Sequence, residues 1–240
     1  MNVILSSTST DTADRSPLQR RIGVVVIGQS PRPTMEAEVA AVLSPGITIE
    51  LRGALDGMSR DEIDLIPPVD GADALFTLLP NGDNVRISKK AVEGRANAQL
   101  AKFRHEGIDV VMLACTGKFP NLTPEGLVIL PSAVLHKMVE AVLPKGRLGV
   151  FSPLAEQTAL IAGKWQREGV EVVGVTLQPG SDDAVVDAAA REMSAKTPDL
   201  VVLDCMSYTS ANKARVRRHY AGPVILSIAA AARVVEELVS

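Results

Sequence analysis

The chain of 240 residues is 46% hydrophobic and 22% charged, which is typical of a globular protein with enough core for one large or two small domains. Its net charge is −3, and no stripe of Lys and Arg supplies the positive surface that nucleic acid or an anionic membrane requires. No apolar run approaches the ~18 residues needed to cross a bilayer. These observations exclude nucleic acid and membranes as expected partners.

The opening segment, residues 1–20, is rich in Ser, Thr and Asp and lacks the basic start and apolar centre of a signal peptide. We expect it to be a disordered tail on a cytoplasmic protein. The chain contains two cysteines, Cys115 and Cys205. Without a signal peptide, a structural disulfide between them is not expected.

The hydrophobic periodicity predicts strands and helices that alternate along the chain. In the first half we expect strands at 21–27, 47–51, 109–114 and 127–130, and helices at 35–43, 89–106 and 131–142. A β-hairpin is expected at 74–88, because Asn81-Gly82 lies between two apolar runs. In the second half we expect strands at 147–151, 170–175, 200–204 and 224–227, and helices at 154–168, 182–195, 211–219 and 229–239. Strands separated by helices of this length form largely parallel sheets with helices on both faces, which is an α/β fold.

Three segments recur in the same order in the two halves, which indicates an internal duplication. Residues 107–115 align with 197–205, and each segment ends in a cysteine. Upstream, 21–25 resembles 147–151, and downstream, 128–133 resembles 224–229. Ligands of parallel sheets bind beyond the carboxyl ends of the strands, where both cysteines are expected. If the halves pack about a pseudo-twofold axis, the two thiols meet across one pocket. The alternative is that each cysteine is a small buried apolar residue at a strand end.

A pair of opposed thiols is suited to proton transfer at carbon. A free thiol has a pKa of ~8.5, which a helix N-terminus or a positive neighbour such as Lys118 lowers. One thiolate can remove a proton beside a carboxylate while the opposite thiol returns one, which is racemisation without a cofactor. The carboxylate needs oriented donors, and Arg32 offers a bidentate partner. The candidate substrate-binding residues are Gln29, Ser30, Arg32, Thr116, Gly117, Ser207, Tyr208 and Thr209.

Other functional constellations are weaker. His105, His136 and His219 lack the short ligand spacings of a metal site, so we expect surface or helix-end positions and no metal. Neither G-x-G-x-x-G nor G-x-x-x-x-G-K occurs, so no nucleotide cofactor is expected. Asp204 either orients a group in the pocket or caps the following helix, and the sequence leaves both open.

Four segments, 28–32, 75–79, 85–93 and 202–208, resemble the AroM family, which is related to the aspartate/glutamate/hydantoin racemase superfamily. The resemblance implies two flavodoxin-like parallel-sheet lobes related by a pseudo-twofold axis, with the active site in the cleft between them. It implies that Cys115 and Cys205 are catalytic and that Thr116 holds the substrate carboxylate. The chain departs from that pattern in two places: no Asp-Ser-Gly follows the first strand, and no His follows the second cysteine.

The resemblance also implies a division into a first lobe of residues 21–132, completed by the C-terminal helix 229–240, and a second lobe of residues 133–228. The function we expect is a cofactor-independent isomerase or racemase of a small carboxylate or amino-acid-like substrate. A single-cysteine isomerase or decarboxylase, and a non-catalytic binding or regulatory protein on the same scaffold, are the alternatives. A homodimer is expected only because twofold assemblies are common.

Overall fold

The computed structural model describes residues 20–240, so the expected tail lies outside the described residues except for Arg20, which begins β1. The first half contains β1 (Arg20–Val26), α1 (Pro33–Ala40), β2 (Ile47–Gly53), α2 (Arg60–Asp64), β3 (Ala74–Leu78), β4 (Asn84–Ser88), α3 (Lys89–His105), β5 (Val110–Ala114) and β6 (Leu127–Ile129). The second half contains α4 (Pro131–Val142), β7 (Gly146–Ser152), α5 (Ala155–Ala159), α6 (Ile161–Trp165), β8 (Val170–Thr176), α7 (Asp183–Ala195), β9 (Leu200–Leu203), α8 (Ser210–Val216), β10 (Val224–Leu226) and α9 (Ser227–Val239).

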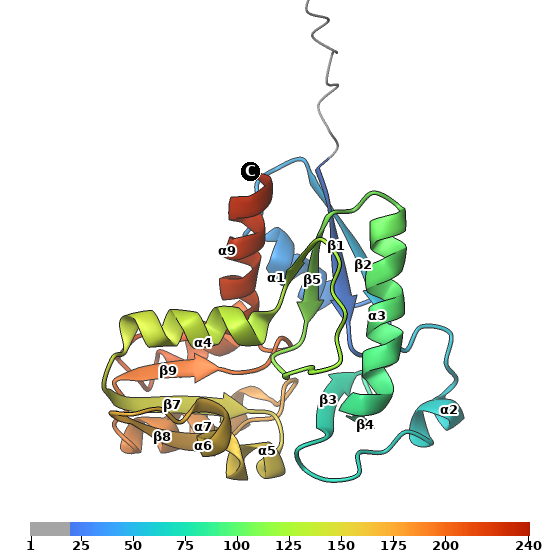
Figure 1. Ribbon diagram of the computed structural model, residues 1–240. Helices are drawn as coiled ribbons and strands as arrows, with labels where there is room; N and C mark the ends of the chain where they lie inside the picture. Colours follow the sequence, from blue (N-terminus) through green and yellow to red (C-terminus); the bar gives the residue numbers. More distant parts are fainter. Residues whose placement is uncertain (1–19) are drawn as a thin grey trace, which may run out of the picture.

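The strands form two four-stranded parallel sheets and one antiparallel hairpin (Figure 1). The first sheet has the order β2-β1-β5-β6, and the second, read from its other edge, has the equivalent order β8-β7-β9-β10. The predicted hairpin is β3 paired with β4. The expected α/β fold with one parallel sheet in each lobe is therefore confirmed.

The duplication seen in the sequence extends to the pairing register. Gly23 of β1 pairs with Val111 of β5, and Gly149 of β7 pairs with Val201 of β9, which are the equivalent residues of the repeat. Each glycine lies where a helix side chain crosses its strand. A Cβ on Gly23 would lie 3.0 Å from the ring of Phe103, and one on Gly149 would lie 2.6 Å from the sulfur of Met193. The repeated glycine thus has the same packing role in both sheets.

The two sheets share part of their core. The C-terminal helix α9 packs against α1, β5 and β6, so the end of the chain returns to the first sheet (Figure 1). Helix α4 contacts α9 and β5 while its Leu135 and Val139 join the core of the second sheet. One cluster of core side chains includes Phe76 from the first half and Met206 from the second. Since α4 serves both sheets, a division of the chain at residue 133 stays a prediction.

The expected helix at 154–168 is two short helices, α5 and α6, that meet at Leu160. The hydroxyl of Thr158 donates to the Leu154 carbonyl at 3.2 Å and contacts the hydroxyl of Ser152 at 2.6 Å. Side chains that bond back to the helix in this way bend it. Helix α2 was not predicted, although its capping box of Ser59 and Glu62 is a recognised start signal. Between residues 20 and 240, no helix is long and apolar enough to span a membrane.

Candidate active site

A cavity of about 300 Å³ lies at the carboxyl ends of the central strands of both sheets. Its wall includes Val26 from the end of β1, Ala114 from β5 and Ser152 from β7. Residues that directly follow β9, Asp204 and Cys205, complete this part of the wall. Ligands of parallel sheets bind in this position, so the cavity lies where the strand pattern predicted a site.

Six of the sequence-predicted site residues line this cavity: Arg32, Cys115, Thr116, Gly117, Cys205 and Ser207. Both cysteines therefore belong to the wall of the same cavity, one from each sheet. The other four residues, Gln29, Ser30, Tyr208 and Thr209, are not part of its wall.

Each of these four residues has hydrogen-bond partners elsewhere. The Gln29 amide donates to the Met58 carbonyl at 2.7 Å, and the Ser30 hydroxyl donates to the Asp56 carboxylate at 2.8 Å. These bonds tie the loop after β1 to the turn after β2. Tyr208 is fully buried and donates to the Leu177 carbonyl, whereas Thr209 caps α8. The geometry gives all four side chains structural roles.

Burial makes both thiols weak acids. It raises the pKa of the half-buried Cys115 to about 12 and that of the buried Cys205 to about 11. The Gly117 N–H, which donates to the Cys115 sulfur at 3.3 Å, opposes this rise in the pKa of Cys115. We expected a thiolate favoured by a following helix, but residues 115–126 contain no helix. Both residues are therefore protonated thiols at neutral pH.

Arg32 is a buried cation that pairs with no anion. Its side chain is 8% exposed and donates to the Leu78 carbonyl at 3.2 Å and to the Ser207 hydroxyl at 3.2 Å. Both partners are neutral, and among residues 20–240 no carboxylate forms an ion pair with this guanidinium. Burial lowers the pKa of Arg32, and the charge at Cys205 opposes that change. A buried guanidinium without a counter-charge is costly, and an anionic ligand would compensate it.

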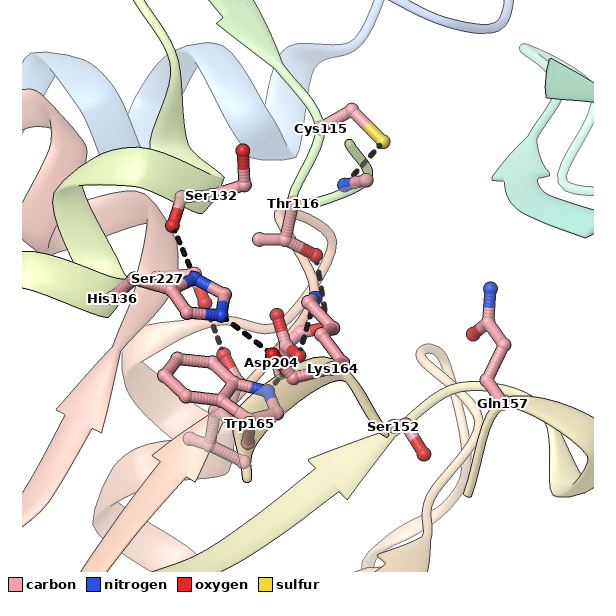
Figure 2. A network of polar contacts seen from close by, with 12 residues as sticks. Cys115, Thr116, Ser132, His136, Ser152, Gln157, Lys164, Trp165, Asp204 and Ser227 are labelled. Atoms are coloured by element: carbon pink, nitrogen blue, oxygen red, sulfur yellow. Dashed lines mark hydrogen bonds and ion pairs between the residues drawn. The ribbon is translucent and has the colours of Figure 1, made fainter. Parts of the chain in front are cut away.

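A second polar group in the wall is built around Asp204 (Figure 2). The Lys164 ammonium lies 2.6 Å from Asp204 Oδ2, and the Trp165 indole N–H donates to the same oxygen at 2.8 Å. The backbone carbonyl of Asp204 accepts from the Thr116 hydroxyl at 3.1 Å, which links the loops that follow the two cysteine strands. Asp204 does not cap α8, because Thr209 does. This settles the question that the sequence left open.

His136 supports this group and is not the surface or helix-end residue that we expected. It lies in the middle of α4, and its ring stacks on Trp165 with centroids 4.2 Å apart and planes 5° from parallel. Its two ring nitrogens lie 2.7 Å from the Ser132 carbonyl and 2.8 Å from the Lys164 carbonyl (Figure 2). The imidazole thus fixes the end of α6 that carries Lys164. Among the described residues, no group of His, Cys, Asp and Glu could hold a metal ion.

Sequence reasoning missed Lys164, Trp165 and the role of His136. The repeat contained one usable signal, because it places Asp204 where the first half has Ala114. A carboxylate at a buried strand end needs a partner of opposite charge, and the half-buried Lys164 is that partner. It also lowers the pKa of Cys115, the role that the sequence suggested for the exposed Lys118.

The fold is similar to that of three enzymes whose structures have been solved. Glutamate racemase isoform RacE1 from Bacillus anthracis matches with a TM-score of 0.60 and 15% identity, covering 91% of this chain and 81% of that chain. Maleate isomerase Iso from Pseudomonas putida S16 matches with a TM-score of 0.57 and 20% identity, covering 91% and 92%. Arylmalonate decarboxylase matches with a TM-score of 0.58 and 16% identity, covering 91% and 92%. At such identities the likeness concerns the fold alone.

A separate comparison, of the sequence with family models, shows the family to which the chain belongs. The family model described as AroM protein matches residues 22–239, which is almost the whole chain. The chain therefore belongs to the AroM family. No curated protein sequence matches it.

Proposed function

We propose that this AroM-family chain is a cofactor-independent isomerase or racemase that moves a proton on the carbon next to a carboxylate. Cys115 and Cys205 are the acid and base. The observation that carries the proposal is that one cysteine from each sheet lines a single cavity, which is also lined by Arg32, whose guanidinium has only neutral partners. The racemase, the isomerase and the decarboxylase described above show that this scaffold can carry such chemistry, and they identify neither the reaction nor the substrate of this chain.

In the proposed reaction the substrate carboxylate pairs with Arg32. One thiol first loses its proton to solvent; its thiolate then removes the proton from the α-carbon, and the electron pair of the broken C–H bond moves into the carboxylate group. The thiol on the other side then donates its proton to the opposite face of that carbon. The first sulfur ends as a thiol and the second as a thiolate, so the site is set for the reverse reaction.

Cys205 is the thiol that we assign as the first proton acceptor. Burial raises its pKa to about 11, and the Ser207 N–H and the Arg32 charge oppose that rise by stabilising its thiolate. Arg32 also bonds the Ser207 hydroxyl at 3.2 Å, so the cation and the donor that favour this thiolate are held together. Cys115, whose pKa burial raises to about 12, is the thiol that we assign to keep its proton until it donates that proton to the carbanion.

The test is exchange of solvent deuterium into a panel of carboxylates, amino acids and hydantoins, followed by NMR. We expect the wild type to label the α-carbon of its substrate, and we expect Cys115→Ser and Cys205→Ser each to lower the rate by about 10²- to 10⁴-fold. Arg32→Met should weaken substrate binding, because it removes the partner of the carboxylate. Arg60→Met, which replaces an exposed arginine outside this cavity, is the matched control.

Each alternative predicts a different result. If one cysteine variant keeps wild-type exchange, the chemistry needs a single cysteine, and the two-thiol mechanism is wrong. If the wild type binds carboxylates but exchanges none of the panel, the chain is a binding protein on a racemase-like scaffold.

A further inference from the structure

We propose that Asp204 restricts the site to substrates with one carboxylate and an apolar remainder, because it neutralises a second cation of the wall, the half-buried Lys164. The inference rests on the proposed function only in that both concern the same cavity. It is a statement about binding, so it can be tested whether or not the chain catalyses proton transfer.

The charged side chains that line the cavity differ in how deeply they are buried. Arg32 is buried, whereas Lys118 is exposed and Lys89 is half-buried with its ammonium on the Ala72 carbonyl at 2.6 Å. An exposed ammonium stays hydrated and contributes little to an ion pair. A buried charge depends on its partner. The buried residues therefore decide how many negative charges the ligand needs near the thiols.

Lys164 already has its partner. Its ammonium lies 2.6 Å from Asp204 Oδ2, and the two side chains are 23% and 2% exposed. The other carboxylate oxygen, Oδ1, is buried and accepts no hydrogen bond from any described residue. A second ligand carboxylate near this pair would meet a neutralised cation and an unbonded carboxylate oxygen, which repels it. Arg32 remains as the one buried cation in the wall that lacks a counter-charge.

The apolar part of the wall disfavours a second charge as well. Large apolar side chains line it from both halves of the chain: Met35, Leu75, Phe76, Leu160, Ile161 and Met206. A carboxylate placed against these groups would lose its hydration without gaining a hydrogen bond. A methyl or methylene group there would instead be removed from water, which is favourable. The chemical class that fits is a small monocarboxylate with an apolar substituent.

Pentanoate and glutarate test this inference, because they have the same carbon chain and differ only by a terminal methyl group or carboxylate. We expect isothermal titration calorimetry on the wild type to show pentanoate binding at least about tenfold more tightly, a factor that corresponds to about 1.4 kcal/mol. Equal or tighter binding of glutarate would overturn the inference, and so would failure to bind pentanoate. Deuterium exchange plays no part in this measurement, so a failure here is distinct from a failure of the proposed reaction.

Two variants assign the preference to the Lys164–Asp204 pair. Asp204→Asn keeps the shape but leaves Lys164 without a counter-charge, so glutarate should gain about tenfold relative to pentanoate. The double variant Lys164→Met with Asp204→Asn removes both charges, so it should keep the preference for pentanoate. An unchanged ratio in Asp204→Asn contradicts the role of Asp204. If that single variant fails to fold, the double variant decides, since a preference for glutarate there also overturns the inference.

Discussion

The two lobes repeat one design as far as the ends of β5 and β9 and differ immediately beyond them. Strand order and register are the same, and each of these strands leads to a cysteine. In the first lobe Ala114 precedes a half-buried Cys115, whereas in the second Asp204 precedes a buried Cys205. The duplicated fold explains why two thiols reach one cavity, and the change from Ala to Asp at one position explains why their surroundings differ.

For each thiol, the cation that favours its thiolate comes from the opposite lobe. Arg32, from the loop after β1, favours the thiolate of Cys205 in the second lobe. Lys164, from α6, favours the thiolate of Cys115 in the first lobe. Burial raises the pKa of both thiols, and in each case a cation from the opposite half of the chain opposes part of that rise. A single lobe carries a cysteine without the cation that assists it.

The largest effect that we expect concerns the two cysteines, one in each lobe: the rate at which each thiol is alkylated should depend strongly on pH. Because both thiols have a pKa of about 11 or above, the thiolate fraction should rise about tenfold per pH unit, or about 100-fold from pH 7 to pH 9. Iodoacetamide rates on Cys115→Ser and Cys205→Ser, followed by mass spectrometry, measure each remaining thiol separately. A rate that levels off below pH 9 would show a thiolate that these surroundings do not explain.

A smaller effect tests whether the repeated glycines are equivalent. Gly23→Ala and Gly149→Ala should each lower the free energy of unfolding by about 1–3 kcal/mol, because the added methyl group overpacks a buried contact. The contacts are Phe103 in the first lobe and Met193 with Pro198 in the second. Urea denaturation followed by circular dichroism gives both values.

The control for this pair is Gly94→Ala on the exposed face of α3, where a Cβ would meet nothing within 4 Å. It should stabilise the protein by about 0.5–1 kcal/mol, as alanine does in an exposed helix. If only one of the two strand glycines proves sensitive, the lobes do not share the packing that their register indicates.

Most of the fold could be predicted from the sequence because local signals agreed with the tertiary structure. Unbroken apolar runs marked the parallel strands, and Asn81-Gly82 marked the hairpin. The aligned cysteine and glycine segments correctly matched the registers of the two sheets. Two elements differed: α2 was not predicted, and the helix expected at 154–168 is broken near Thr158, whose hydroxyl contacts Ser152 at the end of β7 and Thr176 at the end of β8.

The candidate site was less predictable, because its polar contacts join distant parts of the chain. Strand ends correctly indicated where Cys115 and Cys205 lie, and the loop after β1 indicated Arg32. The same reasoning could not tell side chains that face the cavity from neighbours that brace loops, as Gln29 does. Nor could it find Lys164, because the residues around Lys164 give no sign that it pairs with Asp204, which lies 40 residues further along the chain.

The most direct test of the central claim, that both thiols share one site, is labelling of the wild type with N-ethylmaleimide, followed by intact-mass spectrometry. We predict that one label, at the more exposed Cys115, occupies the cavity of about 300 Å³ and blocks the second reaction. Cys115→Ser should then accept its single label at Cys205. A wild type that takes two labels, each at the rate of the corresponding single variant, would show that the thiols are independent and would contradict the two-thiol site.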